Sequence, residues 1–173
     1  MDQGVEAATI KRIYWRIIPL FFAMMFLNYL DRINIGFAGL RMNQDLGFGP
    51  AVFGLGASVF FVGYMILEVP SNLMLHVLGA RVWLARILMT WGAVATCMAF
   101  TSGTWSFYGL RFGLGLAEAG FMPGVVLYFT YWFPARYRAR AIAGYIIAGS
   151  VSAVLGGVQG IALQRHREVS PRR

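Results

Sequence analysis

Five long apolar segments, each long enough to cross a lipid bilayer, constrain this chain more than any other feature. A transmembrane helix needs about 20 mainly apolar residues. Inside a bilayer the backbone amides must bond within their own segment, so such segments become α-helices. Charged residues make up only 13% of the chain, against about 25% in soluble domains. The sequence therefore predicts an all-α integral membrane protein with about five transmembrane helices. We expect these spans at residues 13–38, 51–75, 83–102, 105–131 and 139–163.

Short connections separate the segments, at residues 43–50, 79–81, 101–104 and 133–140. The last of these is basic and is expected to be a turn. Pro123 fits a kink in the fourth span, and Pro134 fits a helix end. Small residues four apart let helices in lipid approach closely, so we expect packing at three glycine pairs. These pairs are 109 with 113, 120 with 124, and 156 with 160.

The arginines and lysine predict how the chain is oriented, because positive residues in short loops stay on the cytoplasmic side. If the amino terminus is cytoplasmic, most loop cations lie on that side and only Arg41 lies opposite. The cytoplasmic set is Lys11, Arg12, Arg16, Arg81, Arg86, Arg136, Arg138 and Arg140. A net charge of +8 would suggest nucleic-acid binding in a soluble protein. Here the cations alternate with spans, so topology explains them and no nucleic-acid partner is expected.

A polar cluster interrupts the first span and includes Tyr29, Asp31 and Arg32. A charge at the centre of a membrane helix costs about 2.5–3.5 kcal/mol, so such groups usually pair, face a cavity or move ions. In one interpretation Asp31 and Arg32 form an interfacial ion pair that reaches water. In the other, Asp31 carries a proton beside a guanidinium that binds an anionic substrate.

Arg111 and Glu118 lie in the fourth span, seven residues apart. Seven residues are close to two helical turns, so the two side chains share a face and are separated by about 10 Å along the axis. We expect each to meet a group outside its own helix, Asp31 in the case of Arg111 and Arg32 or a substrate proton in the case of Glu118. The alternative is a buried ion network that only fixes the register of the helices.

The second span carries Tyr64 and Glu68. Tyr64 could present its hydroxyl to a cavity, although plain packing explains a membrane tyrosine equally well. Glu68 precedes Pro70, and its place favours helix capping or a hydrogen bond between helices over substrate contact. His76 and His166 lack the spacing of a metal site, and no nucleophile motif occurs. We expect no enzyme activity, no catalytic residue, no metal and no cofactor.

Four segments in order resemble the first half of a transporter of the major facilitator superfamily, in particular its anion:cation symporter family of tartrate, phthalate and sugar-acid permeases. They are residues 28–38 (NYLDRINIGFA), 64–73 (YMILEVPSNL), 110–124 (LRFGLGLAEAGFMPG) and 131–141 (YWFPARYRARA). The resemblance implies proton-coupled uptake of an organic anion across the bacterial inner membrane, by rocking of two six-helix halves.

The resemblance also assigns roles to single residues. It implies that Asp31 and Glu118 are protonatable carboxylates, that Arg32 binds the anion and that Arg111 partners the acid of the first helix. Tyr29 and Tyr64 match cavity tyrosines that hydrogen-bond substrate.

Two departures from the family pattern concern the loop after the second span and the end of the chain. His76 and Val77 stand where the family usually has an acid and a base, before Gly79 and Arg81. In the family this acid helps to hold one of the alternating states closed, so we expect the balance between these states to be altered here. Residues 164–173 are basic and do not resemble the family. We therefore expect residues 1–163 to be a partial amino-terminal domain that lacks its carboxy-terminal half. The alternative function is an inactive fragment, or a small membrane protein that binds other subunits through helix packing.

Overall fold

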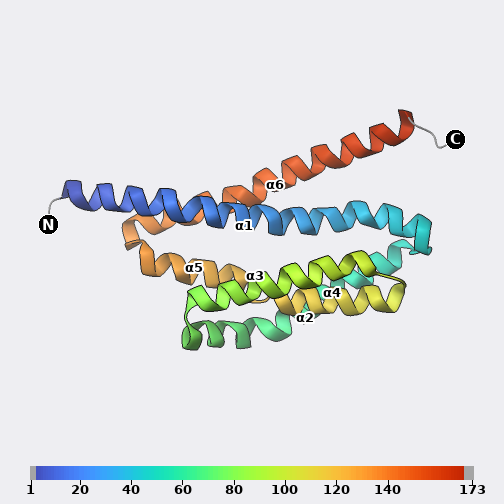
Figure 1. Cartoon of the computed structure of the whole chain (residues 1–173), viewed down its shortest axis with the longest axis horizontal. Coiled ribbons are helices and arrows are strands. Elements are labelled where there is room, and N and C mark those ends of the chain that lie inside the picture. Colours follow the sequence, from blue (N-terminus) through green and yellow to red (C-terminus); the bar gives the residue numbers. More distant parts are fainter. Residues whose placement is uncertain (1–2, 170–173) are drawn as a thin grey trace. The chain divides into compact units, whose positions relative to one another are not determined.

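The structure, a computed structural model, describes the backbone of residues 3–169 and their side chains except those of 3–4, 34, 37–46 and 158–169. The described helices follow one another along the chain (Figure 1). They are α1 (Gln3–Leu46), α2 (Pro50–Leu78), α3 (Ala80–Cys97), the short 3-10 helix η1 (Met98–Phe100), α4 (Thr104–Glu118), α5 (Phe121–Trp132) and α6 (Ala135–Val169). They divide between two compact units, one made of residues 1–38 and 132–173 and the other of residues 39–131.

Within residues 3–169, five stretches of helix are long and apolar enough to cross a membrane. The prediction of an all-helical membrane chain with five spans is therefore confirmed. The stretches are Val5–Ile33, Pro50–Leu78, Ala80–Phe100, Thr104–Trp132 and Ala135–Gly157.

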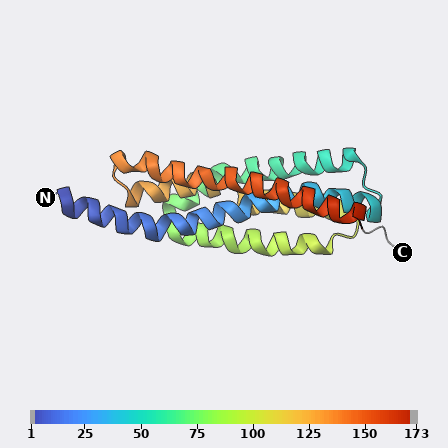
Figure 2. The same cartoon turned by 90° about the horizontal axis from the view of Figure 1, so that it is seen from above.

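In the first unit, α1 and α6 run in the same direction (Figures 1 and 2). They pack along small residues of α6. A side-chain carbon on Gly149 would lie 3.1 Å from the ring of Tyr29, and one on Gly156 would lie 2.9 Å from Ile33. Between these two positions, the hydroxyl of Ser152 donates a hydrogen bond of 2.9 Å to the carbonyl of Phe26. The small residues thus let the two helices lie close enough for direct contact.

In the second unit, α2 and α4 also run in parallel and approach each other through glycines. A side-chain carbon on Gly115 would lie 2.9 Å from the backbone nitrogen of Tyr64, and one on Gly63 would lie 3.3 Å from that of Leu116. Only glycine leaves room for a neighbouring backbone at this distance. The two helices therefore hold a fixed register over the length that carries Arg111.

The expected packing glycines differ in how closely they are approached. Gly120, Gly124 and Gly156 lie against other elements, as predicted. Gly109 has nothing within 4 Å of where its side chain would start, and Gly113 has only Val94, at 3.7 Å. The prediction of tight packing at that pair is wrong, because the face of α4 that meets α2 carries Gly115 instead. The side chain of residue 160 lies outside the described part.

The fourth span is broken, whereas a single helix over residues 105–131 was expected. α4 ends at Glu118 and α5 begins at Phe121, with Gly120 in the left-handed region at φ 82°. Pro123 therefore sits in the first turn of α5, where its missing N–H costs no helical hydrogen bond. The expected kink in the fourth span is present, but it lies at Gly120 and not at Pro123.

Other helix ends also deviate from the predicted turns. α5 ends at Trp132, just before Phe133 and Pro134, which agrees with a helix end at that proline. Residues 135–140 are nevertheless the first turns of α6 and not a basic turn. α1 continues to Leu46, where Gly47 at φ 66° ends it, so only residues 47–49 form the first connection. The end of α2 at Leu78, followed by Gly79 at φ 83°, agrees with the sequence.

Candidate substrate and proton site

Arg111 lies in the middle of α4 and is buried against α2, with 8% of its surface exposed. Its Nε–H donates a hydrogen bond to the carbonyl oxygen of Gly56, 3.3 Å away. Its guanidinium carbon lies 4.7 Å from the centre of the Phe60 ring, where the electrons of the ring face attract a cation. Both contacts come from α2, so this helix fixes where the positive charge points.

Glu118 is the last residue of α4 and has only 3% of its surface exposed. The helix is unbroken from Arg111 to Glu118, so the two side chains lie on one face with about 10 Å between them along the axis. One helix face inside a candidate span therefore buries a positive and a negative group.

A chain of two hydrogen bonds holds the backbone directly after Glu118. The hydroxyl of Ser71 donates to the carbonyl oxygen of Ala119 at 2.7 Å and accepts from the indole N–H of Trp83 at 2.8 Å. The break between α4 and α5 leaves the carbonyl of Ala119 outside the regular hydrogen bonds of either helix. Ser71 therefore supplies the hydrogen bond that neither helix provides.

Sequence reasoning missed this role of Ser71 and Trp83. A usable signal was present, because glycine and proline break membrane helices and a neighbouring hydroxyl often satisfies the backbone groups that are freed. The sequence alone could not say which of the chain's hydroxyl groups would do so.

Tyr64 lies on α2 and is half-buried. Its ring centre is 6.3 Å from that of Phe60, the same ring that Arg111 covers. The structure thus brings Tyr64 and Arg111 to one aromatic side chain. Glu68 is one turn further along α2 and is also half-buried.

The first-span cluster belongs to the other unit. Asn28 is buried, Asp31 is half-buried, and Tyr29 and Arg32 are exposed on α1. The ring of Tyr29 packs on α6 at Gly149, which fixes its place on the helix pair. The expected pairing of Asp31 with Arg111 joins the two units and stays a prediction.

Comparison with known proteins decides the family. Residues 21–164 match the sequence model of the Major Facilitator Superfamily. The chain belongs to this superfamily. It is accordingly a multi-pass membrane chain from a superfamily of transporters, not of enzymes. The resemblance that the four motifs indicated is therefore confirmed.

Several bacterial proteins are similar to almost the whole chain. A protein of Agrobacterium vitis named "Putative tartrate transporter" is 53% identical over 167 residues, which cover 96% of this chain and 37% of that protein. "Putative metabolite transport protein NicT" of Pseudomonas putida is 52% identical over 157 residues, covering 91% and 36%. "Quinolone resistance transporter" of Acinetobacter baumannii is 44% identical over 165 residues, covering 91% and 38%. The chain thus spans less than two fifths of the length of these relatives.

Proposed function

We propose that this chain is the amino-terminal portion of a proton-coupled symporter for an organic anion, a carboxylate or sugar acid such as tartrate. The observation that carries the proposal is the burial of Arg111 and Glu118 on one face of α4. A charge within a membrane span costs about 2.5–3.5 kcal/mol. Two such charges on one helix face are best explained by a task that needs both.

Arg111 and Arg32 are the proposed partners of the anion. A guanidinium is planar, stays charged at any accessible pH and can bind a carboxylate through two parallel hydrogen bonds. Gly56 and Phe60 hold Arg111 in one orientation, which reduces the entropy lost when the anion binds. Tyr29 and Tyr64 are proposed to donate hydroxyl hydrogen bonds to the same substrate.

Glu118 and Asp31 are the proposed proton carriers. Nearby charges change how readily a carboxylate holds a proton. An anion that arrives next to Arg111 or Arg32 therefore alters the proton occupancy of these two acids. This link between anion binding and protonation is the proposed basis of symport.

The proposed orientation and location of the protein rest on its loop charges and on its similarity to bacterial proteins. The cations at the start of α1 and of α6 favour a cytoplasmic amino terminus, and the relatives described above are bacterial. We place the protein in the bacterial inner membrane. Residues 1–163 would form part of one helical half, with residues 164–173 as a tail unlike the family. The other half would complete a site near mid-membrane, about which two halves rock.

The alternative, an inactive piece or a chain that only packs against other subunits, is favoured by one observation. The chain covers 37% of the Agrobacterium relative, and an alternating-access cycle needs two opposed helical halves. The two proposals differ in what a protein extended to full length does.

The test compares the chain alone with a chimera in which the remaining part of the Agrobacterium relative follows it. Both are placed in proteoliposomes with labelled tartrate outside and an imposed inward proton gradient. We expect accumulation by the chimera and none by the chain alone. Accumulation by the chain alone would contradict the need for a second half. Absence of gradient-dependent uptake of tartrate or of a sugar acid by the chimera would contradict the transport proposal.

A further inference from the structure

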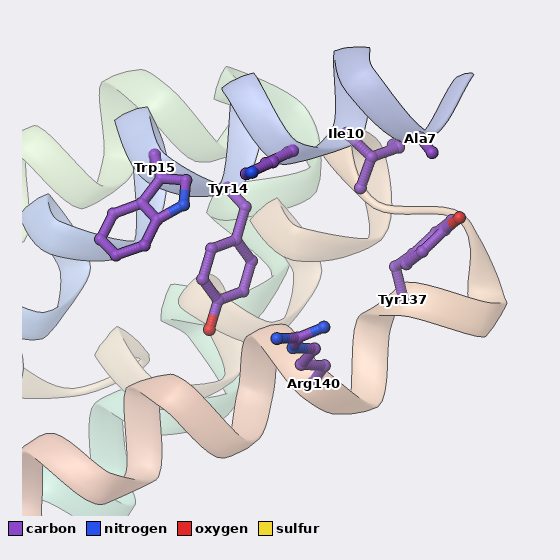
Figure 3. A pocket seen from close by; sticks show the side chains of 7 residues that line it. Ala7, Ile10, Tyr14, Trp15, Tyr137 and Arg140 are labelled. Carbon is purple, nitrogen blue, oxygen red and sulfur yellow. The ribbon is translucent and has the colours of Figure 1, made fainter. Parts of the chain in front are cut away.

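A cavity of about 340 Å³ lies between the first turns of α1 and the first turns of α6, within one compact unit (Figure 3). Its side chains combine two cations with three aromatic rings. From α1 come Lys11, Tyr14 and Trp15, and from α6 come Tyr137 and Arg140. Tyr14 and the polar cluster at Asp31 are 17 residues apart on α1, about 25 Å along the axis. The cavity is therefore separate from the proposed substrate site.

The walls of the cavity are fixed by contacts across the two helices. The guanidinium carbon of Arg140 lies 5.9 Å from the centre of the Tyr14 ring. The Tyr14 ring packs edge-on against the ring of Phe133, with 6.2 Å between the two ring centres. A side-chain carbon on Gly144 would lie 2.9 Å from the Tyr14 hydroxyl oxygen. Because Gly144 carries no side chain, Tyr14 can lie against α6 and bring α1 to Arg140.

The charge of this region favours an anion. Glu6 is the carboxylate described near the cavity, and it forms an ion pair with Arg136 across the same two helices. Lys11 and Arg140, by contrast, line the cavity itself. The neighbouring acid, Glu6, is thus paired with Arg136. The two cations that line the cavity are complementary to a phosphate group.

The depth of the cavity points to a lipid as the source of that phosphate. The candidate span Val5–Ile33 is 29 residues long, about 43 Å of helix, whereas the hydrocarbon core is about 30 Å thick. The first turns of α1 therefore reach the headgroup region, where tyrosine and tryptophan are enriched. Basic pockets between membrane helices on the cytoplasmic side bind anionic headgroups.

We propose that this cavity binds the headgroup of an anionic phospholipid, with Lys11 and Arg140 on the phosphate and the aromatic rings beside the glycerol and upper acyl chain. The lipid would then join the amino end of α1 to the start of α6, in addition to the ion pair between Glu6 and Arg136.

Native mass spectrometry of the chain, released from micelles with equal amounts of phosphatidylglycerol and phosphatidylcholine, tests the proposal. We expect retained phosphatidylglycerol. Removing one charge near an anionic lipid weakens binding about fivefold, so Lys11→Gln should lose about that much and Lys11→Gln with Arg140→Gln about 30-fold. Arg140→Lys keeps the charge and should retain most of the binding.

Arg12→Gln is the matched control, because Arg12 is next to Lys11 but lines a separate hollow with Val5, Ala8 and Thr9 of α1 alone. Equal retention of phosphatidylcholine, or equal losses in the control and in the double variant, would overturn the proposal. Glycerol 3-phosphate has the same phosphate without acyl chains, and binding of it as tight as that of the lipid would assign the cavity to a free phosphate. Circular dichroism checks the helix content. If the double variant loses helix, the single variants Lys11→Gln and Arg140→Lys are compared with Arg12→Gln instead. Lys11→Gln should then bind the lipid more weakly than the other two.

Discussion

Gly115→Ala tests the contact between α2 and α4 that positions Arg111. The added carbon would lie 2.9 Å from the backbone nitrogen of Tyr64 and 3.1 Å from the carbonyl carbon of Phe60, and closer still to the Phe60 oxygen. Carbon atoms in favourable contact are about 3.5–4.0 Å apart. Because the obstacles are backbone atoms, no side-chain rotation relieves the clash, and the helices must separate.

We expect a loss in the free energy of unfolding near the upper end of the range for overpacked cores, about 3 kcal/mol. Thermal unfolding in micelles, followed by circular dichroism, measures it. Gly109→Ala and Gly113→Ala are controls on the same helix, since neither meets an atom closer than 3.7 Å. Alanine favours a helix over glycine by about 1 kcal/mol, so both should be neutral or stabilising. If Gly115→Ala is as stable as these controls, the close approach of α2 and α4 is wrong.

Two further substitutions test contacts that lie outside the proposed substrate site. Ser71→Ala removes the hydroxyl that donates to the carbonyl of Ala119 and accepts from Trp83, and it should cost about 1–3 kcal/mol, since the buried carbonyl loses its partner. Ser58→Ala is its exposed control, and equal melting temperatures would contradict the role of Ser71. Glu6→Gln breaks an exposed ion pair with Arg136 and should leave the melting temperature nearly unchanged, because solvent screens exposed charges. A clear drop in the melting temperature would contradict this expectation.

The number of spans and their helical structure could be predicted from the sequence. Crossing a bilayer requires a long apolar segment, and such segments, for example residues 51–75, are visible in the sequence itself. Helix ends inside the membrane were harder to place. The apolar run through residues 105–131 hides the break at Gly120, since hydropathy does not change there. Residues 136–140 were expected to form a turn because they contain three arginines. Charged residues at a membrane surface are equally compatible with a helix, and these belong to α6.

The candidate charges were visible in the sequence, because ionisable residues in apolar runs are rare. Their surroundings were not. Which carbonyl Arg111 contacts and which hydroxyl donates to the carbonyl of Ala119 depend on how α2 and α4 pack. Spacing within one helix places Arg111 and Glu118 on a face, but it carries no information on the neighbouring helix. The glycines that matter most for that contact, Gly63 and Gly115, belong to none of the expected pairs.

We propose above that Glu118 couples proton movement to anion transport. The most direct measurement compares gradient-driven accumulation with exchange of labelled tartrate in proteoliposomes of the extended protein carrying Glu118→Gln. Exchange moves substrate in both directions and needs no net proton flow. We predict that the variant still exchanges tartrate and no longer accumulates it under an inward proton gradient. Accumulation with the same dependence on the gradient as in the unsubstituted protein would contradict this role of Glu118.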